Sequence, residues 1–529
     1  MDDRSAPELP ATFNAADYFV DRHLREGRGD RIAVECGAER VTYAALAARV
    51  AAVGEALQAG FGVRREERVL LWLLDSPAFF YGFWGAIRAG AVPVPVNTMW
   101  KAADVAYVLH DCRARVAVVS AALLPVWHSI PLAQRRGIEH VLVADGAPGD
   151  GALALDKVIA QSGNAGDPAP TSRDDAAFWL YSSGSTGPPK GCVHLQHDMV
   201  VCASAYARHV LEISERDRCF SVAKLFFAYG LGNALYFPLS VGGTSILWPG
   251  PATATAIYEI IERHCPTLLF SVPTSYGMLL AHESGGARDF DLSSVRLALS
   301  AGEALPAALF DRFKRRFGIE ILDGIGSTEV LHTFIANRAG CARPGSSGEI
   351  VPGYEARLVD EAGAPVPTGE VGNLLIKGDS ICACYWNQHE RTKATIEGHW
   401  IRTGDKYHQD ADGYYWHAGR ADDMLKVGGI WVSPAELEHT MVEHPAVQAC
   451  GVAGRPDHDA LIKPIAYVVV RAGVTPSAEL AADLQRFARE RLAEYKRPRW
   501  VEFIDALPTT ATGKIQRFKL RERALGQPG

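Results

Sequence analysis

The feature that most limits the fold is an alternation between two kinds of apolar segment, which runs from about residue 41 to residue 320. Segments of strand length alternate with longer segments whose apolar residues repeat at helical spacing. Such alternation is typical of parallel sheets covered by helices, and it predicts an α/β protein. The predicted strands cover residues 68–74, 115–120, 267–272, 295–300 and 319–322. The predicted helices cover residues 43–59, 77–89, 192–211 and 307–317.

The pattern changes in the last third of the chain. Short extended runs separated by glycine and proline turns predict a small antiparallel β subdomain over about 345–421. A boundary near residue 422 precedes an independent α+β unit, whose first helix is indicated by the capping box SPAE at residues 433–436, with proline at the first helical position. We therefore predict a large N-terminal domain over 1–421, with mostly parallel, helix-covered sheets, and a small C-terminal domain over 422–529.

A short loop of unusual composition follows the apolar residues 177–181, which we predict to form a buried strand. The segment YSSGSTGPPKG over residues 181–191 combines glycines, hydroxyl side chains and one lysine. Its glycines let backbone N–H groups approach an anion closely, while the hydroxyls and the lysine add donors and a positive charge. The residues that we predict to bind phosphate are Ser182, Ser183, Gly184, Ser185, Thr186, Gly187 and Lys190.

This loop differs from the Walker A phosphate loop, which has glycine directly before its lysine and Ser or Thr after it. Here Pro189 precedes Lys190 and Gly191 follows it. A Ser/Gly-rich surface turn is the plain alternative. The length of the segment and its place at the end of an apolar strand favour a phosphate site.

Composition and charge limit the classes of function. Hydrophobic residues make up 48% and charged residues 22% of the 529 residues, as in ordinary soluble globular proteins. The net charge is −7, so nothing indicates a nucleic-acid surface. The N-terminus MDDRSAPELP is acidic and the apolar residues 78–96 are interrupted by Arg88 and prolines, so we expect no signal peptide, no membrane span and a cytoplasmic location. The ten cysteines lack paired CxxC spacing, and we expect them to be reduced.

The loop at 181–191 resembles the phosphate loop of the adenylate-forming enzymes, which include acyl-CoA synthetases, adenylation domains of peptide synthetases and luciferases. Four further signatures of that family follow in the family's order: GIGSTE at 324–329, TGD at 403–405, GRADD at 419–423 and TGK at 512–514. One such motif is weak evidence, and five in order are strong. The resemblance covers the chain from about residue 30 to its end.

The resemblance implies a two-step reaction with ATP, Mg²⁺ and, as the thiol substrate, coenzyme A. A carboxylate attacks the α-phosphorus of ATP, pyrophosphate leaves, and a thiol then attacks the acyl adenylate. Because the protein has little covalent work to do in the first step, catalysis consists of positioning the reactants and neutralising charge on phosphate oxygens.

Particular residues match the roles of the family's motif residues. Glu329 resembles the magnesium ligand, and Thr328 beside it is expected to contact the α-phosphate. Asp405 resembles the carboxylate that accepts the ribose hydroxyls, and Arg420 the guanidinium that contacts ribose or phosphate. Lys514 resembles the lysine that bridges the reacting carboxylate and the α-phosphate. The residues expected to flank adenine are Gly302, Glu303, Asp323, Gly324 and Ile325.

Each of these side chains also has a plain structural interpretation. A glutamate after a Gly-rich strand end is often a helix cap, an Asp and an Arg in loops are often surface ion-pair partners, and a lysine in a basic tail is often solvated. Because these residues occur together with the other motifs in one chain, we favour the functional interpretation in each case.

In the family the small C-terminal domain is mobile and rotates after adenylation, so that a different face enters the site. The resemblance places the hinge at Asp422. It places the coenzyme A tunnel at Lys426, Gly428, Gly429 and Trp431. The last of these is a departure, because some acetyl-CoA synthetases have an arginine there that contacts coenzyme A. The contacts to the nucleotide part of coenzyme A therefore stay open.

The segment KLFFAYGLGN at 224–233, together with DGIGSTEVLH at 323–332, is most similar to benzoate-CoA ligases and their hydroxybenzoate relatives. In the family this region lines the acyl pocket, often with a histidine where Phe227 stands. Flat rings and small residues suit a planar aryl acid better than a flexible fatty chain. One of the aromatic residues Phe226, Phe227 and Tyr229 is expected to be ordinary core. The expected wall residues are Lys224, Phe227, Ala228, Tyr229, Gly230, Gly326, His332 and Thr333.

Thr333 is a departure from typical benzoate ligases, which carry an aliphatic residue at that position. Because an unmatched buried hydroxyl is costly, we expect it to serve a substrate that bears a hydroxyl or amino group.

Three alternatives accompany the aryl-CoA ligase hypothesis. The chain could adenylate an aryl acid and load a separate carrier protein, it could be a P-loop ATPase, or it could bind an adenylate without catalysis. Pro189 disfavours the second, and the full set of charged groups disfavours the third. The expected partners are an aromatic carboxylic acid, ATP and coenzyme A, with no nucleic acid and no membrane, and a homodimer is left open.

Overall fold

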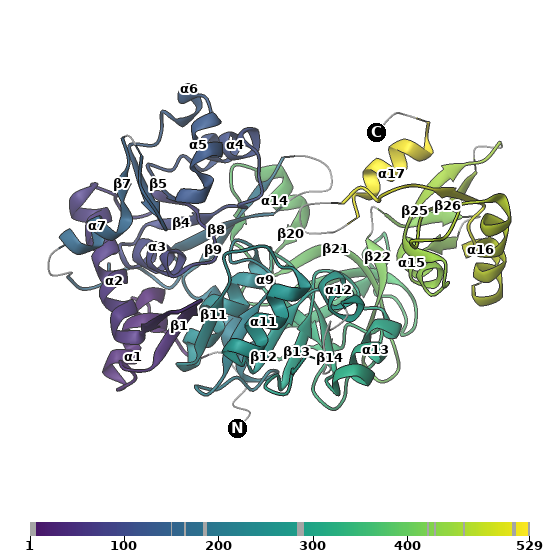
Figure 1. The fold of residues 1–529 in the computed structure, drawn as a ribbon, viewed down its shortest axis with the longest axis horizontal. Coiled ribbons are helices and arrows are strands. Elements are labelled where there is room, and N and C mark those ends of the chain that lie inside the picture. The colour runs from purple at the N-terminus through teal and green to yellow at the C-terminus, as the bar shows by residue number, and fades with distance from the viewer. Residues whose placement is uncertain are drawn as a thin grey trace.

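The structure is a computed structural model of the chain, and it describes residues 7–149, 151–162, 166–182, 188–282, 290–420, 423–427, 430–458, 461–492, 494–509 and 515–526. Of Lys426, Ile430, Trp431 and Tyr495 it describes the backbone alone. Figure 1 shows a large N-terminal part built of several sheets and a smaller C-terminal part at its side, as predicted.

The largest layer is a nine-stranded sheet in the order β16-β15-β14-β13-β12-β10-β11-β1-β2. Its six middle strands pair in parallel, while β2 at one edge and β15 and β16 at the other pair antiparallel. The strands are β1 (Ile32–Cys36), β2 (Glu39–Thr42), β10 (Arg218–Ser221), β11 (Thr244–Leu247), β12 (Leu268–Ser271), β13 (Leu297–Ser300), β14 (Ile321–Gly326), β15 (Thr333–Ala336) and β16 (Glu349–Ile350).

A second sheet is parallel throughout, in the order β4-β3-β5-β6-β7. Helix α3 (Pro77–Arg88) contacts both β1 of the first sheet and β3 and β4 of the second, and its residues from Pro77 to Ile87 are all buried. This explains why the helix is apolar on every side. The strands are β3 (Arg68–Trp72), β4 (Val92–Pro95), β5 (Val116–Ser120), β6 (His140–Ala144) and β7 (Leu153–Ala154).

The remaining helices of the N-terminal domain cover these two sheets and the segments that join them (Figure 1). π-helical turns extend α2 to Gly60 and α8 to Arg208. The helices are α1 (Arg22–Arg25), α2 (Tyr43–Glu55), α4 (Ala102–Cys112), α5 (Leu124–Ser129), α6 (Leu132–Arg135), α7 (Leu155–Gln161), α8 (Asp198–Cys202), α9 (Ala228–Leu231), α10 (Phe237–Val241), α11 (Ala254–His264), α12 (Pro273–Ala281), α13 (Ala307–Phe317) and α14 (His389–Thr395).

The predicted phosphate loop joins the two strands of an antiparallel hairpin, β8 (Ala176–Ser182) and β9 (Lys190–Leu195). The buried strand predicted at 177–181 is confirmed. The helix predicted over 192–211 is wrong at its start, because residues to Leu195 form β9 and α8 begins only at Asp198. The cause is tertiary: β9 also pairs with β19 (Cys384–Tyr385), and that pairing overrides the local apolar spacing.

The β subdomain is antiparallel, as predicted. Its sheet has the order β17-β18-β21-β20, with β22 paired to β21. The strands are β17 (Glu355–Val359), β18 (Gly372–Lys377), β20 (Ile396–Glu397), β21 (Trp400–Gln409) and β22 (Tyr415–Arg420).

The C-terminal domain has a separate core between a three-stranded sheet and its helices. The predicted helix start is confirmed, because the Ser433 hydroxyl accepts the Glu436 amide at 3.2 Å and Pro434 is the first residue of α15. The elements are β23 (Leu425–Val427), β24 (Ile430–Val432), α15 (Pro434–Val442), β25 (Val447–Pro456), β26 (Ile462–Val470), α16 (Ala478–Arg491), β27 (Trp500–Phe503) and α17 (Arg517–Ala524).

Ion pairs connect the beginning of the C-terminal domain to its last helix. The Asp423 carboxylate lies 2.8 Å from Arg521 and 3.5 Å from Arg517, both of α17. Arg517 also donates to Glu438 of α15 at 3.1 Å, and Glu438 accepts the backbone amide of Val452 at 2.8 Å. One charged cluster therefore joins α15, β25, α17 and Asp423, which lies two residues before β23.

Within the described part of the chain, no helix has both the length and the apolar character that crossing a membrane requires. All ten cysteines are free thiols, as predicted.

Candidate active site

Lys190 and Glu329, from two different motifs, meet at the base of the hairpin loop. The Lys190 ammonium donates to Glu329 Oε1 at 3.1 Å, and the Tyr385 hydroxyl donates to the same oxygen at 2.8 Å. The Ser182 hydroxyl lies 3.5 Å from it. The structure therefore brings Ser182 and Lys190, the two predicted phosphate-binding residues that it describes, to the carboxylate predicted to bind magnesium.

Glu329 is ionised in this environment. Burial acts to raise the pKa of its carboxyl, but the Lys190 charge and the hydrogen bonds from Tyr385 and Lys190 outweigh burial and leave the pKa below its usual value. Among the described residues no group of three or more metal-ligating side chains exists. A single ionised carboxylate fits Mg²⁺, because this ion is commonly held by one or two carboxylates together with substrate phosphates.

Thr328 lies beside Glu329 in the turn that follows β14. Among the residues that the structure describes, its hydroxyl has no hydrogen-bond partner, whereas its carbonyl lies 2.8 Å from His194 Nε2. The hydroxyl is therefore available to a phosphate oxygen.

Asp405 and Arg420 are direct cross-strand neighbours on β21 and β22. Arg420 donates to Asp405 Oδ1 at 3.0 Å, and His417 Nε2 lies 3.7 Å from the same oxygen. Burial acts to raise the pKa of Asp405, but His417 and Arg420 outweigh it and the pKa is lowered. A buried, ionised carboxylate of this kind can accept two hydroxyls.

The residues predicted to flank adenine lie at the ends of parallel strands β13 and β14. Gly302 has a φ of +90°, a conformation that favours glycine, and Glu303 accepts from the Thr274 hydroxyl at 3.2 Å. Asp323 is buried, and Gly324 allows close packing because a Cβ there would lie 2.9 Å from the Ile335 carbonyl. Ile325 is partly buried against the main core.

The predicted aryl wall is only partly exposed. Phe226 is buried, so it is the aromatic residue of the three that belongs to the core, while Phe227 and Tyr229 are half-buried. Ala228 and Tyr229 lie on α9, and the Tyr229 ring centroid is 5.5 Å from that of His332. The structure thus brings residues from the segments 224–233 and 323–332 together.

His332 is the buried polar centre of this wall. Its Nε2–H lies 3.2 Å from both the Tyr229 carbonyl and Asn233 Oδ1. Burial lowers the pKa of His332 to about 3, so the ring is neutral. Nδ1 is then an acceptor, and it has no partner among the described residues.

Thr333 is buried at the start of β15, opposite Gly326 of β14. Burial raises the pKa of Tyr206, and the nearby Thr333 side chain opposes that effect. The Tyr206 side chain therefore lies close to Thr333, which the sequence did not indicate.

Three predicted wall residues have structural roles here. Gly230 permits close packing, since a Cβ there would overlap the Lys224 carbonyl. The Lys224 ammonium donates to the carbonyls of Trp248 and Gly250 at 2.6 and 2.9 Å. Gly326 is likewise packed closely, because a Cβ would lie 2.6 Å from the His332 carbonyl.

Several predicted residues lie outside the described part of the chain. They are Ser183, Gly184, Ser185, Thr186, Gly187, Asp422, Gly428, Gly429 and Lys514, and the side chains of Lys426 and Trp431.

Sequence reasoning missed Tyr385, His417, Tyr206 and Asn233. None of them lies in one of the five motifs, although Asn233 ends the segment predicted to line the acyl pocket.

Comparison with known proteins agrees with this geometry. Residues 20–386 match the AMP-binding enzyme family, and residues 436–514 match the AMP-binding enzyme C-terminal domain. A benzoate-CoA ligase of Thauera aromatica is 48% identical over 517 residues, which are 98% of this chain and 97% of the relative. A 4-hydroxybenzoate-CoA/benzoate-CoA ligase of Rhodopseudomonas palustris is 43% identical and covers 97% of this chain and 95% of its own.

A solved structure gives the same result in three dimensions. This chain matches the crystal structure of the anthranilate-CoA ligase AuaEII in complex with anthranoyl-AMP with a TM-score of 0.92. The two sequences are 44% identical, and the match covers 98% of both chains. Five motifs in order, two matched domains and a shared fold over nearly the whole length all agree: the chain belongs to the family of AMP-binding, adenylate-forming enzymes.

Proposed function

We propose that the protein is an AMP-forming aryl-CoA ligase, which activates benzoate or a hydroxy- or amino-substituted benzoate through an aryl adenylate and transfers the aryl group to coenzyme A. The observation that carries this is the ionised Glu329, held by Lys190 and Tyr385 at the base of the phosphate loop. The relatives over nearly the whole chain are ligases of benzoate and hydroxybenzoate.

In the first step the chain's own residues position ATP against the aryl carboxylate. Lys190 and the loop hydroxyls neutralise phosphate oxygens, the Thr328 hydroxyl contacts the α-phosphate, and Asp405 accepts the ribose hydroxyls. Bound Mg²⁺, held by Glu329, would draw charge from the phosphate oxygens. Lys514 brings a point charge to the place where the two anionic reactants meet.

This arrangement requires Lys190 to change partners. In the structure its ammonium is 3.1 Å from Glu329, and the two charges compensate each other. When phosphates and the metal ion are present, the carboxylate gains a cation and the ammonium gains an anion. Charge balance is therefore kept in both states, which avoids an uncompensated buried charge.

We further propose that the preferred acid carries a hydroxyl or amino group on its ring. The unpartnered Nδ1 of neutral His332 supports this, because a buried acceptor without a donor is costly and a substituent could supply the donor. The Thr333 hydroxyl is weaker support for this proposal than the sequence alone suggested, because the Tyr206 side chain lies close to it.

Three measurements test these proposals. Release of AMP and pyrophosphate from ATP with small aromatic acids, with and without coenzyme A, tests the reaction: AMP release and aryl-CoA formation are expected, while ADP would indicate an ATPase. Thioester formation with free coenzyme A separates the ligase from an enzyme that loads a carrier protein.

Comparison of kcat/KM for benzoate, its three monohydroxy forms and its 2-amino form tests the proposal that the acid carries a ring substituent. A strong preference for benzoate would refute that proposal.

A further inference from the structure

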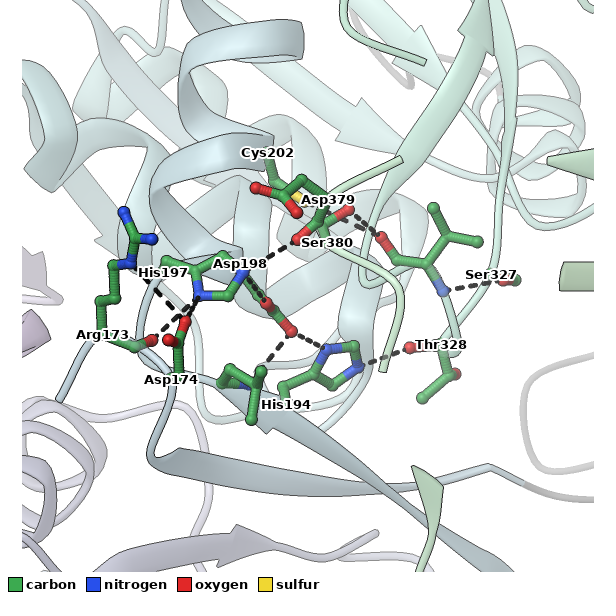
Figure 2. A network of polar contacts seen from close by, with 12 residues as sticks. Arg173, Asp174, His194, His197, Asp198, Cys202, Ser327, Thr328, Asp379 and Ser380 are labelled. Carbon is green, nitrogen blue, oxygen red and sulfur yellow. Dashed lines mark hydrogen bonds and ion pairs between the residues drawn. The ribbon is translucent and has the colours of Figure 1, made fainter. Parts of the chain in front are cut away.

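Three successive carbonyl groups are fixed in the loop that carries Thr328 and Glu329. The Thr328 carbonyl lies 2.8 Å from His194 Nε2, and the next two carbonyls accept from the Cys382 amide at 2.7 Å and the Ser380 hydroxyl at 2.8 Å. The His194 contact comes from β9, and the other two come from the segment before β19; Figure 2 shows the contacts of His194 and Ser380. Of the three contacts, only the one to the Thr328 carbonyl comes from a titratable side chain, that of His194.

His194 is fully buried, with 0% of its side chain exposed, and so is its partner Asp198. Its Nδ1 lies 2.8 Å from Asp198 Oδ2, and its Nε2 lies 2.8 Å from the Thr328 carbonyl. Both neighbours are hydrogen-bond acceptors unless the carboxyl is protonated. A neutral imidazole has one N–H, so the pair must share one further proton: the contacts are satisfied by an imidazolium beside a carboxylate, or by a neutral ring beside a carboxylic acid.

Asp198 is itself held from two sides. Its Oδ2 accepts the Leu195 amide at 3.0 Å, and its Oδ1 lies 3.3 Å from Nε2 of His197. The ring of His197 also lies against the carbonyls of Arg173 and Asp379, at 2.9 and 3.1 Å. Figure 2 shows a network that runs from Arg173 through His197, Asp198 and His194 to Thr328 at its end. The Asp198 carboxyl therefore has little freedom to move, and neither has the His194 ring that it contacts.

We propose that His194, oriented by Asp198, is a positioning residue for adenylate formation. By fixing the Thr328 carbonyl it sets the direction of the Thr328 hydroxyl and the Glu329 carboxylate, which the proposed function assigns to phosphate and magnesium. Burying a proton-sharing pair of this kind is costly, and a hydrophobic pair of similar volume would fill the space. A catalytic loop, however, must be held to within about half an ångström of its working geometry.

Two substitutions of similar size separate the two contacts of the ring. In His194→Gln the side-chain amide reaches the place of Nε2, so a donor to Thr328 is kept and the donor to Asp198 is lost. In His194→Asn the amide lies near the place of Nδ1, so the donor to Asp198 is kept and the donor to Thr328 is lost. Both variants remove the titratable group, which makes each a control for the other.

The assay is pyrophosphate exchange with the full-length enzyme, and thermal unfolding is measured alongside it. We expect His194→Asn to lower kcat for exchange on the order of tenfold or more, with KM for the aryl acid unchanged, because displaced groups raise the barrier to the chemical step. For His194→Gln, kcat for exchange should stay within about threefold of the value for the unchanged enzyme. Its melting temperature should nevertheless fall as far as that of His194→Asn.

Equal loss of exchange in the two variants, in proportion to their loss of stability, would overturn the proposal. Glu329→Gln is measured in the same series. If it leaves exchange intact, the assigned role of the loop fails and the inference about His194 fails with it. If it abolishes exchange while His194→Asn keeps full kcat, the inference alone fails.

Discussion

Asp323 allows the electrostatics around the proposed adenine site to be tested quantitatively. Its carboxyl is buried within β14 and accepts the Leu305 amide at 3.4 Å. Burial raises the pKa of Asp323 from 3.8 to about 8, against the opposing effect of the hydrogen bond from the Leu305 amide. At neutral pH the folded protein therefore keeps this proton, and the unfolded chain releases it.

The sign of the effect follows from this difference. A carboxyl whose pKa is raised on folding contributes its stability fully below the unfolded value, and that contribution is lost as the pH rises through the folded value. Between the two values the free energy of unfolding falls by about 1.4 kcal/mol per pH unit. The slope becomes smaller as the pH approaches the folded pKa of about 8. The free energy of unfolding therefore falls by about 2 kcal/mol between pH 6 and pH 8.

Asp323→Asn should remove this slope, because the amide has the same shape and does not titrate in this range. Urea unfolding of both proteins is followed by tryptophan fluorescence at pH 6, 7 and 8, and the transition of the N-terminal domain is analysed. The stability of the variant relative to the unchanged protein should rise by about 2 kcal/mol between pH 6 and pH 8. Groups common to both proteins cancel in this difference. A difference that stays constant over the range would refute the reasoning.

Three further substitutions test other parts of the site. Lys514→Ala should largely abolish pyrophosphate exchange and spare thioester formation from supplied aryl adenylate; equal loss of both half-reactions would count against two separate poses. Gly429→Leu should block thiol entry and spare exchange, and unchanged coenzyme A turnover would place the tunnel elsewhere. Gly232→Ala should cost about 1–3 kcal/mol of stability and raise KM for the aryl acid, because a Cβ there would overlap the His332 ring; an unaltered KM in binding and turnover assays would show that the ring can move.

Local periodicity predicted where the helices and strands lie better than it predicted which strands pair with each other. The helix predicted over 307–317 is α13 with the same bounds, and the strands predicted over 68–74 and 115–120 contain β3 and β5. The helix predicted from residue 192 failed because β9 is stabilised by β19, which lies almost two hundred residues later in the chain. A contact of that sequence separation leaves no local pattern.

In the candidate site, too, local motifs indicated some residues, whereas others reach the site only through long-range strand pairing. Motifs indicated Lys190, Glu329, Asp405 and Arg420, since each belongs to a run of residues whose chemistry suits phosphate or ribose. Tyr385 could not be found this way, because it reaches Glu329 only through the register that places it opposite Cys192. The roles predicted for these residues stay predictions until the variants are measured.

The carboxylate of Asp423 has a mechanical consequence for the C-terminal domain. Asp423 stands directly after the predicted hinge, and its partners Arg517 and Arg521 follow the TGK motif. These ion pairs tie α17 to the chain just before β23, so the rotation predicted at the hinge would carry both elements together. A domain built in this way would offer its two predicted faces in alternation, because advancing one face would withdraw the other.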